Sequence, residues 1–284
     1  MFAVGLGAAL LASAMFNIGQ ALQAFEARKT PKQHGLRLTL VALLLRRPLW
    51  ILGLVLGVAG VAPQVYAFSL APFAVVQTAT CAGLVLLLYL GARHLHEHVG
   101  LLAYLGVALI LVGVGLVSWG VPSRHDAHRG AFALLAVVGP TVAVAVLPFL
   151  LARVERDLTL LVIVGSGAGF GASNIATKLL SDDAGGGHWP AAIFWAVVVV
   201  AMGVAATITQ MTAFQRAPAT LVVPTTTAIQ TFVPVVLEPF FLRESWRSVP
   251  AYGAPLVFGL ACATAGAILV TRTTAVGKMA AAAS

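Results

Sequence analysis

Uncharged polar side chains interrupt two of the long apolar segments in this sequence. In the later segment they are Thr226, Thr227 and Gln230, and in the earlier one they are Gln77, Thr78 and Thr80. Amides and hydroxyls both donate and accept hydrogen bonds, so a set of them can bind a small polar molecule. Polar groups are costly in an apolar environment and turn towards the inside of a helix bundle. We predict that the two segments form the walls of a binding site; the alternative is that their hydrogen bonds only join neighbouring helices.

A second polar set lies closer to the ends of the apolar segments, where a gate would close. Its members are Asn17, Gln64, Asn174, Lys178, Gln210 and Glu238. Lys178 and Glu238 fall at a similar depth, so a pair between their side chains is one interpretation. For the four amides, the alternative is again hydrogen bonding between helices. For the charged residues, it is that Lys178 reaches the membrane interface and Glu238 meets Arg243 or water.

Two histidine-containing clusters carry metal-binding side chains with little constraint on their spacing. One consists of His94, His96 and His98 beside Glu97, and the other of His125, Asp126 and His128. Either set offers ligands for a transition metal. We favour solvated loops as the interpretation of both, and no metal site is predicted.

Neither a phosphate-binding loop nor an enzyme active site is indicated. Gly165, Gly167, Gly169 and Gly171 lie inside an apolar segment with no preceding strand, so the phosphate-loop pattern lacks its context. Glycines four residues apart suit close helix packing instead. Nothing resembles a Ser/His/Asp triad or a paired-carboxylate site, so we expect neither enzymatic activity nor a cofactor.

The composition places these residues in a membrane protein. Of 284 residues, 60% are hydrophobic and 9% are charged, and the mean hydropathy is +0.98. An ordinary soluble domain is about 45–50% apolar and about 25% charged, so a soluble enzyme, a disordered chain and a secreted disulfide scaffold are excluded. The net charge of +8 comes from Lys and Arg in short loops, where they set membrane orientation and indicate no nucleic-acid partner.

Apolar runs long enough to cross the bilayer recur along the whole chain. A helix of about 20 residues spans the hydrocarbon core. Nine spans are predicted, at 2–24, 49–69, 71–92, 99–120, 130–151, 158–180, 189–213, 218–241 and 250–271. Residues 37–48 are apolar but too short to cross, and we expect an interfacial helix there. The predicted fold class is an all-α, polytopic membrane helix bundle.

Lys and Arg are distributed unequally between the two sides of these spans. The loops after odd-numbered spans and the C-terminal tail hold 12 of the 17 Lys and Arg residues, and the other side holds five, four in loops and Lys178 near the end of a span. By the positive-inside rule the richer side is cytoplasmic, which puts the N-terminus outside and the C-terminus inside. We expect a multi-pass protein of the cytoplasmic (inner) membrane.

An internal repeat relates the two halves of the chain. Residues 64–72 read Gln-Val-Tyr-Ala-Phe-Ser-Leu-Ala-Pro, and residues 210–218 read Gln-Met-Thr-Ala-Phe-Gln-Arg-Ala-Pro, so five of nine positions agree. Further matches join Asn17-Ile18 and Leu22 to Asn174-Ile175 and Leu179, and Ala103-Tyr104 to Ala251-Tyr252. Spans 1–4 therefore correspond to spans 6–9.

The repeat has a period of five spans, and this odd number puts the two halves in opposite orientations. The predicted units are a first repeat (1–120), a connector span with its loops (121–157) and a second repeat (158–284). Inverted repeats of this kind are typical of alternating-access carriers, whose substrate site lies near the middle of the membrane.

Short motifs in both halves resemble the drug/metabolite transporter (EamA-like) superfamily. They are Arg47-Pro48-Leu49-Trp50, Tyr66-Ala67-Phe68 and Ala71-Pro72 in the first half, and Pro224 and Phe240-Phe241-Leu242-Arg243-Glu244 in the second. Within it, the chain looks most like the nine-span branch that includes NIPA-type magnesium transporters. Two positions depart from the family pattern: Thr78 stands where members usually have Pro, and Leu90-Gly91-Ala92 stands where they usually have Leu-x-Glu. Members commonly have ten spans.

The resemblance and the inverted repeat predict a secondary transporter that moves a small organic metabolite or drug by alternating access. The first alternative is transport of Mg²⁺ or another divalent cation of the NIPA type, which the lack of a carboxylate at mid-membrane depth disfavours. The second alternative is a non-transporting membrane scaffold. The expected partners are a small-molecule or ion substrate and the lipid bilayer, and a homodimer is left open.

Overall fold

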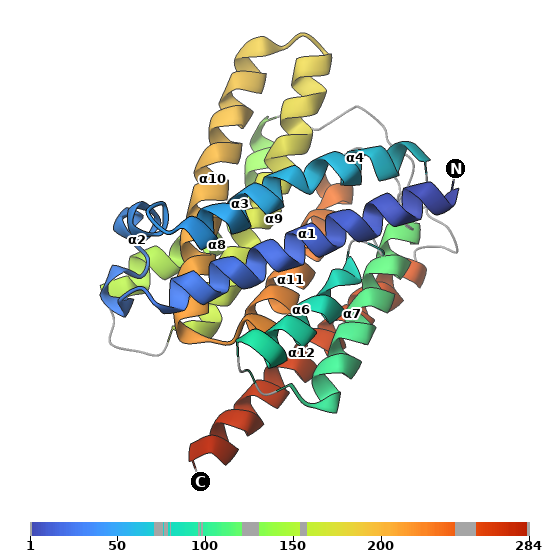
Figure 1. Ribbon diagram of the computed structural model, residues 1–284. Coiled ribbons are helices and arrows are strands. Elements are labelled where there is room, and N and C mark those ends of the chain that lie inside the picture. Colours follow the sequence, from blue (N-terminus) through green and yellow to red (C-terminus); the bar gives the residue numbers. More distant parts are fainter. Residues whose placement is uncertain are drawn as a thin grey trace.

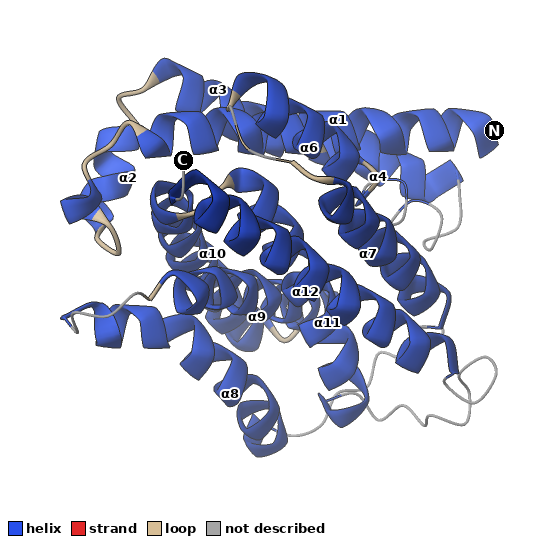
Figure 2. Cartoon of the chain, turned by 90° about the horizontal axis from the view of Figure 1, so that it is seen from below, coloured by secondary structure: helices blue, strands red, loops and turns tan. Residues whose placement is uncertain are grey.

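The computed structural model describes residues 2–70, 76, 79, 81–95, 97, 99–120, 131–153, 158–241 and 254–282. Across these residues every regular element is a helix, and none of them forms a strand (Figure 2). The predicted all-α class is therefore confirmed.

The helices follow one another along the predicted segments. They are α1 (Phe2–Arg28), η1 (Lys32–His34), α2 (Leu38–Leu44), α3 (Pro48–Ala59), α4 (Val61–Leu70), α6 (Gly83–His94), α7 (Leu101–Gly120), α8 (Ala131–Leu150), η2 (Leu151–Arg153), α9 (Thr159–Gly185), α10 (Trp189–Arg216), α11 (Ala219–Phe241) and α12 (Ala254–Ala282), and Figure 1 shows their arrangement. Each α-helix overlaps a predicted span, except α2, which falls within the predicted interfacial segment.

Three helical stretches are long and apolar enough to cross a membrane. They are Ala3–Arg28, Thr159–Thr177 and Trp189–Arg216, and the bent pair Leu38–Leu44 and Pro48–Gln64 would make a fourth. The other apolar helices are shorter within the part that the structure describes. The chain is thus a helical membrane protein, while the number of nine spans and the identity of the membrane stay predictions.

The short helix α2 is separated from α3 by a sharp bend at Pro48. The segments Leu38–Leu44 and Pro48–Gln64 differ in direction by 98°. Arg47 is extended, with φ −101° and ψ 113°, because a proline ring disfavours helical backbone in the preceding residue. Pro48 is then the first residue of α3, a position where its missing N–H costs little. The bend agrees with the prediction of a separate short element before the second span.

Glycines allow α7 and α12 to pack closely along their length (Figure 1). A Cβ added to Gly113 would stand 2.6 Å from the carbonyl oxygen of Gly259. One added to Gly106 would stand 2.8 Å from that of Gly266. Small residues at such crossings bring the backbones together, and the dispersion contacts that follow hold helices where water supplies no driving force.

The α9 glycines have the packing role that the sequence predicts for them. An added Cβ would meet Pro148 of α8 at Gly165, Ile229 of α11 at Gly167 and Ala206 of α10 at Gly169, in each case within 3 Å. Three neighbouring helices therefore pack against one small-residue stretch of α9.

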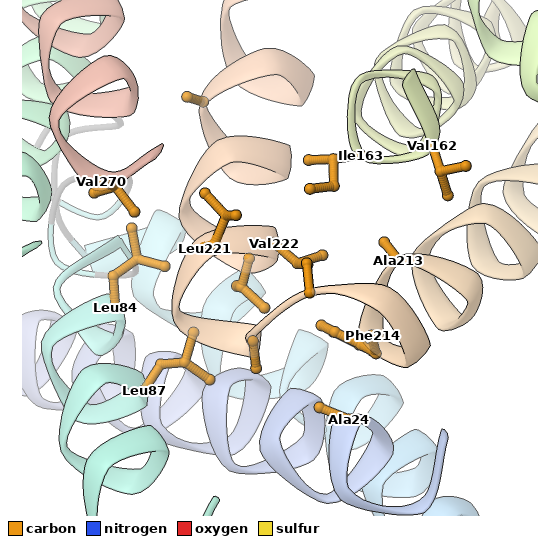
Figure 3. Close-up of a cluster of buried hydrophobic side chains, with 14 of the residues drawn as sticks. Ala24, Leu84, Leu87, Val162, Ile163, Ala213, Phe214, Leu221, Val222 and Val270 are labelled. Carbon is orange, nitrogen blue, oxygen red and sulfur yellow. The ribbon is translucent and has the colours of Figure 1, made fainter. Parts of the chain in front are cut away.

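Helix α11 lies at the centre of the bundle. It contacts α1, α6, α7, α8, α9, α10 and α12. Near its start, the buried side chains of Leu221 and Val222 lie among Leu84 and Leu87 of α6 and Phe214 of α10 (Figure 3). These residues belong to the largest hydrophobic cluster of the described chain, so the start of α11 is fixed from several sides.

We predict that Gly19→Ala destabilises the protein. Its Cβ would stand 2.6 Å from the backbone carbonyl of Gly53, so α1 and α3 would have to separate. Overpacking of this kind costs about 1–3 kcal/mol, which a lower midpoint of thermal unfolding in detergent would report. Gly7→Ala in the same helix is the control, because nothing lies within 4 Å of its added Cβ. That change should stabilise α1 by about 0.5–1 kcal/mol, and equal behaviour of the two variants would contradict the close packing.

Candidate functional site

Two buried threonine hydroxyls on α11 have no hydrogen-bond partner in the part of the chain that the structure describes. Thr225 is 8% exposed and Thr226 is 2% exposed. A threonine within a helix often donates to the carbonyl four residues earlier, as Thr207 and Thr212 do here at 2.8 and 2.7 Å. The hydroxyls of Thr225 and Thr226 make no such bond. That Thr226 binds a ligand stays a prediction, and its unpartnered hydroxyl is the observation that supports it.

Thr226 shares one face of α11 with Gln230, because residues four apart lie one above the other on a helix. Thr225 points about 100° away from Thr226, since a helix has 3.6 residues per turn. Gln230 is half-buried, as is Thr227. The Thr226 and Gln230 face thus combines a buried hydroxyl with an amide that is still partly exposed.

Asn174, predicted as a gate residue, lies beside the predicted binding residue Gln230. Its side-chain nitrogen, on α9, donates to the main-chain oxygen of Gln230 over 3.5 Å, and the side chain is otherwise exposed. Helices α9 and α11 pack together. Lys178 and Glu238 belong to these same two helices, but their side chains lie outside what is described, so their pairing stays a prediction.

The opposite predicted wall, formed by Gln77, Thr78 and Thr80, lies outside the described residues. Its contribution to a site is therefore still a prediction. Later in the same predicted span, α6 packs against α11.

Asn17 serves helix packing. It is 6% exposed and its amide donates to the carbonyl of Ser13 at 2.9 Å. The Ser13 hydroxyl in turn accepts the amide N–H of Gly83 at 2.7 Å, which ties α1 to α6. A Cβ on Gly83 would stand 2.3 Å from the Asn17 nitrogen, so only glycine fits there. Asn17 thus packs against α6, but its own hydrogen bond stays within α1 and does not join two helices.

Gln210 also joins two helices. It is 5% exposed, and its Nε2 donates to the side-chain oxygen of Gln20 at 3.1 Å, which links α10 to α1. Sequence reasoning missed Gln20, although its position three residues after Asn17 puts both on neighbouring parts of α1. Gln64 is half-buried on α4.

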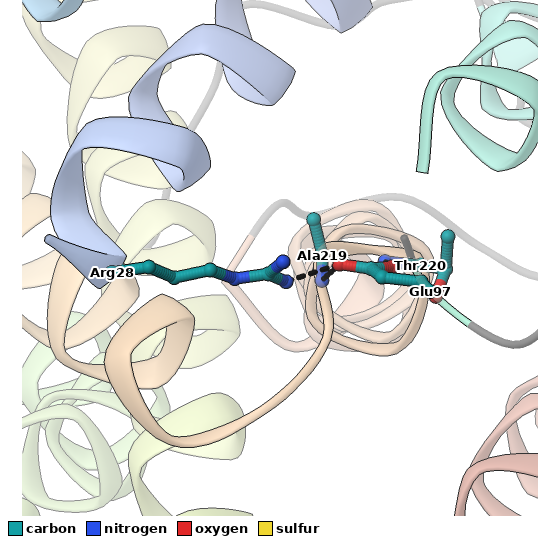
Figure 4. Close-up of polar contacts among 4 residues, drawn as sticks. All are labelled: Arg28, Glu97, Ala219 and Thr220. Carbon is teal, nitrogen blue, oxygen red and sulfur yellow. Dashed lines mark hydrogen bonds and ion pairs between the residues drawn. The ribbon is translucent and has the colours of Figure 1, made fainter. Parts of the chain in front are cut away.

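The Glu97 carboxylate occupies a site that the sequence did not reveal. Its side chain is 4% exposed and accepts the backbone N–H groups of Ala219 and Thr220 at 2.7 and 2.9 Å (Figure 4). The Arg28 guanidinium also donates to it and forms an ion pair. We call the Glu97 carboxylate, Arg28 and these two amides the Glu97 clasp. A carboxylate suits this place because a helix N-terminus carries partial positive charge and unpaired N–H groups.

The loop at Glu97 folds tightly onto the end of α6. The Glu97 N–H donates to the carbonyl of Gly91 at 2.9 Å. A Cβ on Gly91 would stand 2.3 Å from the Thr220 methyl group. The signal that could have found this contact is the start of α11 itself, because Ala217 and Pro218 have no side-chain acceptor to cap it.

The interpretation of Glu97 as part of a solvated histidine loop is therefore wrong, because its carboxylate is buried against α11. No group of three or more His, Cys, Asp or Glu residues that could hold a metal ion occurs among the described residues. Of that cluster, His94 is exposed, whereas His96 and His98 lie outside the description, as does the cluster of His125, Asp126 and His128.

Comparison with protein-family models, with curated proteins and with solved structures finds no match to this chain. The resemblance to drug/metabolite transporters therefore rests on the sequence motifs and stays a prediction.

We predict that Thr226→Val leaves stability unchanged or raises it by up to about 1–3 kcal/mol, because a buried hydroxyl without a partner costs about that much. Thr212→Val is the matched control. Its hydroxyl accepts the N–H of Leu36 at 2.9 Å, so its removal should cost about 1–3 kcal/mol. Thermal unfolding of both purified variants tests the difference. A loss of stability in Thr226→Val equal to that of Thr212→Val would mean that the Thr226 hydroxyl has a structural partner.

Proposed function

We propose that the chain is a secondary carrier that moves a small organic metabolite or drug across the cytoplasmic membrane by alternating access. The proposal treats 1–120 and 158–284 as inverted repeats joined by the connector 121–157. It agrees with the drug/metabolite transporter resemblance of the motifs. In such carriers two related halves exchange roles around a site between them.

The observation that carries the proposal is that the two halves pair their helices in the same way. Helix α1 packs on α3, α4 and α6, and its counterpart α9 packs on α10 and α11. Likewise α6 packs on α7, and α11 on α12. The fourth and ninth predicted spans, α7 and α12, pack on each other. Matching helix pairs in the two halves, together with the repeat in the sequence, support two equivalent moving halves.

Individual residues also agree with this correspondence. The sequence separation that relates Asn17 to Asn174 also relates Glu26 to Asp183, and these carboxylates are 4% and 6% exposed. Gly113 and Gly259 touch where α7 packs on α12, the helices of the fourth and ninth predicted spans.

The proposed substrate site is the Thr226 and Gln230 face of α11. This helix belongs to the second half and also contacts α1, α6 and α7 of the first. The unpartnered Thr226 hydroxyl and the half-buried Gln230 amide favour a substrate with hydrogen-bonding groups.

We predict that purified protein in liposomes transports at least one compound from a panel of polar metabolites, cationic drugs and Mg²⁺. Gln230→Ala and Thr226→Val should each lower uptake measured below saturation by a few-fold to about a hundredfold. A lost hydrogen bond costs about 0.5–1.5 kcal/mol to a neutral substrate group and about 1.5–3 kcal/mol to a charged one.

The controls for this assay are Gln23→Ala, a half-buried amide on α1, and Thr264→Val, an exposed hydroxyl on α12. Both should transport normally. Wild-type uptake by Gln230→Ala and Thr226→Val would put the site elsewhere, and uptake of Mg²⁺ alone would favour the cation alternative. No uptake of any compound would favour a scaffold.

We predict that the N-terminus is external and the C-terminus cytoplasmic, from the distribution of Lys and Arg. Fusions of two reporters to both ends test this, because one reporter is active only in the cytoplasm and the other only outside it. Termini on the same side would require an even number of spans and would remove the odd period on which the inverted repeat depends.

A further inference from the structure

One end of the bundle is closed by polar contacts between the two halves. Gln215, near the end of α10, donates to the carbonyl of Thr30 at 3.1 Å. The Leu36 N–H donates to the Thr212 hydroxyl, also on α10, at 2.9 Å. Leu36 has a φ of 56°, a left-handed conformation that is unfavourable for leucine and has to be held by its surroundings. The segment after α1 is therefore fastened onto α10.

The Glu97 clasp lies at this same end. Arg28 and Glu97 belong to the first half, and the Ala219 and Thr220 amides begin the central helix of the second (Figure 4). One carboxylate thus joins the end of α1, the loop after α6 and the start of α11.

We propose that the Glu97 clasp is the gate contact of this end of the protein, and that the end opens when Glu97 leaves the start of α11. This inference rests on the proposed alternating access, because a fixed scaffold has no need to open. Glu97 then acts as a positioning residue for α11, and not as a residue that binds substrate.

The chemistry of the clasp suits repeated opening and closing. In the closed state, the carboxylate satisfies two helix N–H groups and the guanidinium. In an open state, water enters and can solvate all of them, so neither state leaves a buried polar group unpaired.

The test measures exposure of a buried position beside the clasp. Ala24 is fully buried and lies one turn before Arg28 on the same side of α1. With Cys81 and Cys262 replaced by alanine, Ala24→Cys reports opening through its rate of reaction with a water-soluble maleimide. Ala176→Cys, equally buried on α9, reports general loosening of the fold.

Glu97→Gln should raise the labelling rate of Ala24→Cys by roughly ten- to a hundredfold, since the charge-assisted bonds that it removes are worth about that factor. Arg28→Gln should raise it as well, whereas Arg28→Lys should restore much of the closed state. The double variant Glu97→Gln/Arg28→Gln should raise the labelling rate by less than the product of the two single increases, because both substitutions act on one contact. Lys29→Gln is the matched control: its ammonium pairs with Glu26 at 2.9 Å and takes no part in the clasp.

Unchanged labelling of Ala24→Cys in both Glu97→Gln and Arg28→Gln would overturn the proposal. So would an equal rise at Ala176→Cys, because the clasp would then only hold the fold together. The assay needs no substrate, so it fails or succeeds separately from the transport assay. Opening without transport of any compound would overturn the proposed carrier function, while the clasp would still be shown to close this end of the protein.

Discussion

The first backbone N–H groups of α11 lie inside the bundle and need hydrogen-bond partners. The packing of the neighbouring segments depends on which group supplies them. The first N–H groups of any helix lack partners within that helix. Pro218 offers no side-chain acceptor, so the partner comes from another part of the chain, the Glu97 carboxylate. The buried negative charge then requires a cation, which Arg28 supplies. The positions of α1, the α6 loop and α11 are thereby fixed relative to one another.

The need to pair buried polar groups also explains the contacts of two predicted gate residues, Asn17 and Gln210. Asn17 bonds within α1 beside the Ser13 and Gly83 contact, and Gln210 bonds Gln20 across two helices. An amide in an apolar interior needs a partner whether or not a ligand ever arrives, so residue type alone does not separate packing from binding. The hydroxyls of Thr225 and Thr226 are different because no described group satisfies them. The candidate site therefore contains fewer residues than the polar set identified in the sequence.

Local features of the sequence predicted much of the fold, and distant contacts could not be predicted. Long apolar runs located the helices, the short apolar run at 37–48 indicated a separate element before the second span, and the α9 glycines indicated close packing. Glu97 was misread because its histidine neighbours suggested a solvated loop, while its partner Ala219 is 122 residues away. Length alone identifies three spans, because the other apolar helices are shorter within the described residues. The burial of the Glu97 carboxylate depends on a contact between distant segments of the folded chain, so local sequence features do not predict it.

Helix α11 connects the Glu97 clasp to the proposed binding face. Thr226 follows Ala219 by seven residues, about 10 Å along the helix axis. Pro224 lies between them and has no N–H, so the carbonyl of Thr220 loses its helical partner and the helix is weakest in that turn. A displacement of the capped end therefore reaches Thr226 through a turn that can bend. The clasp and the Thr226 face are joined by the helix, but they are not constrained to move as one rigid body.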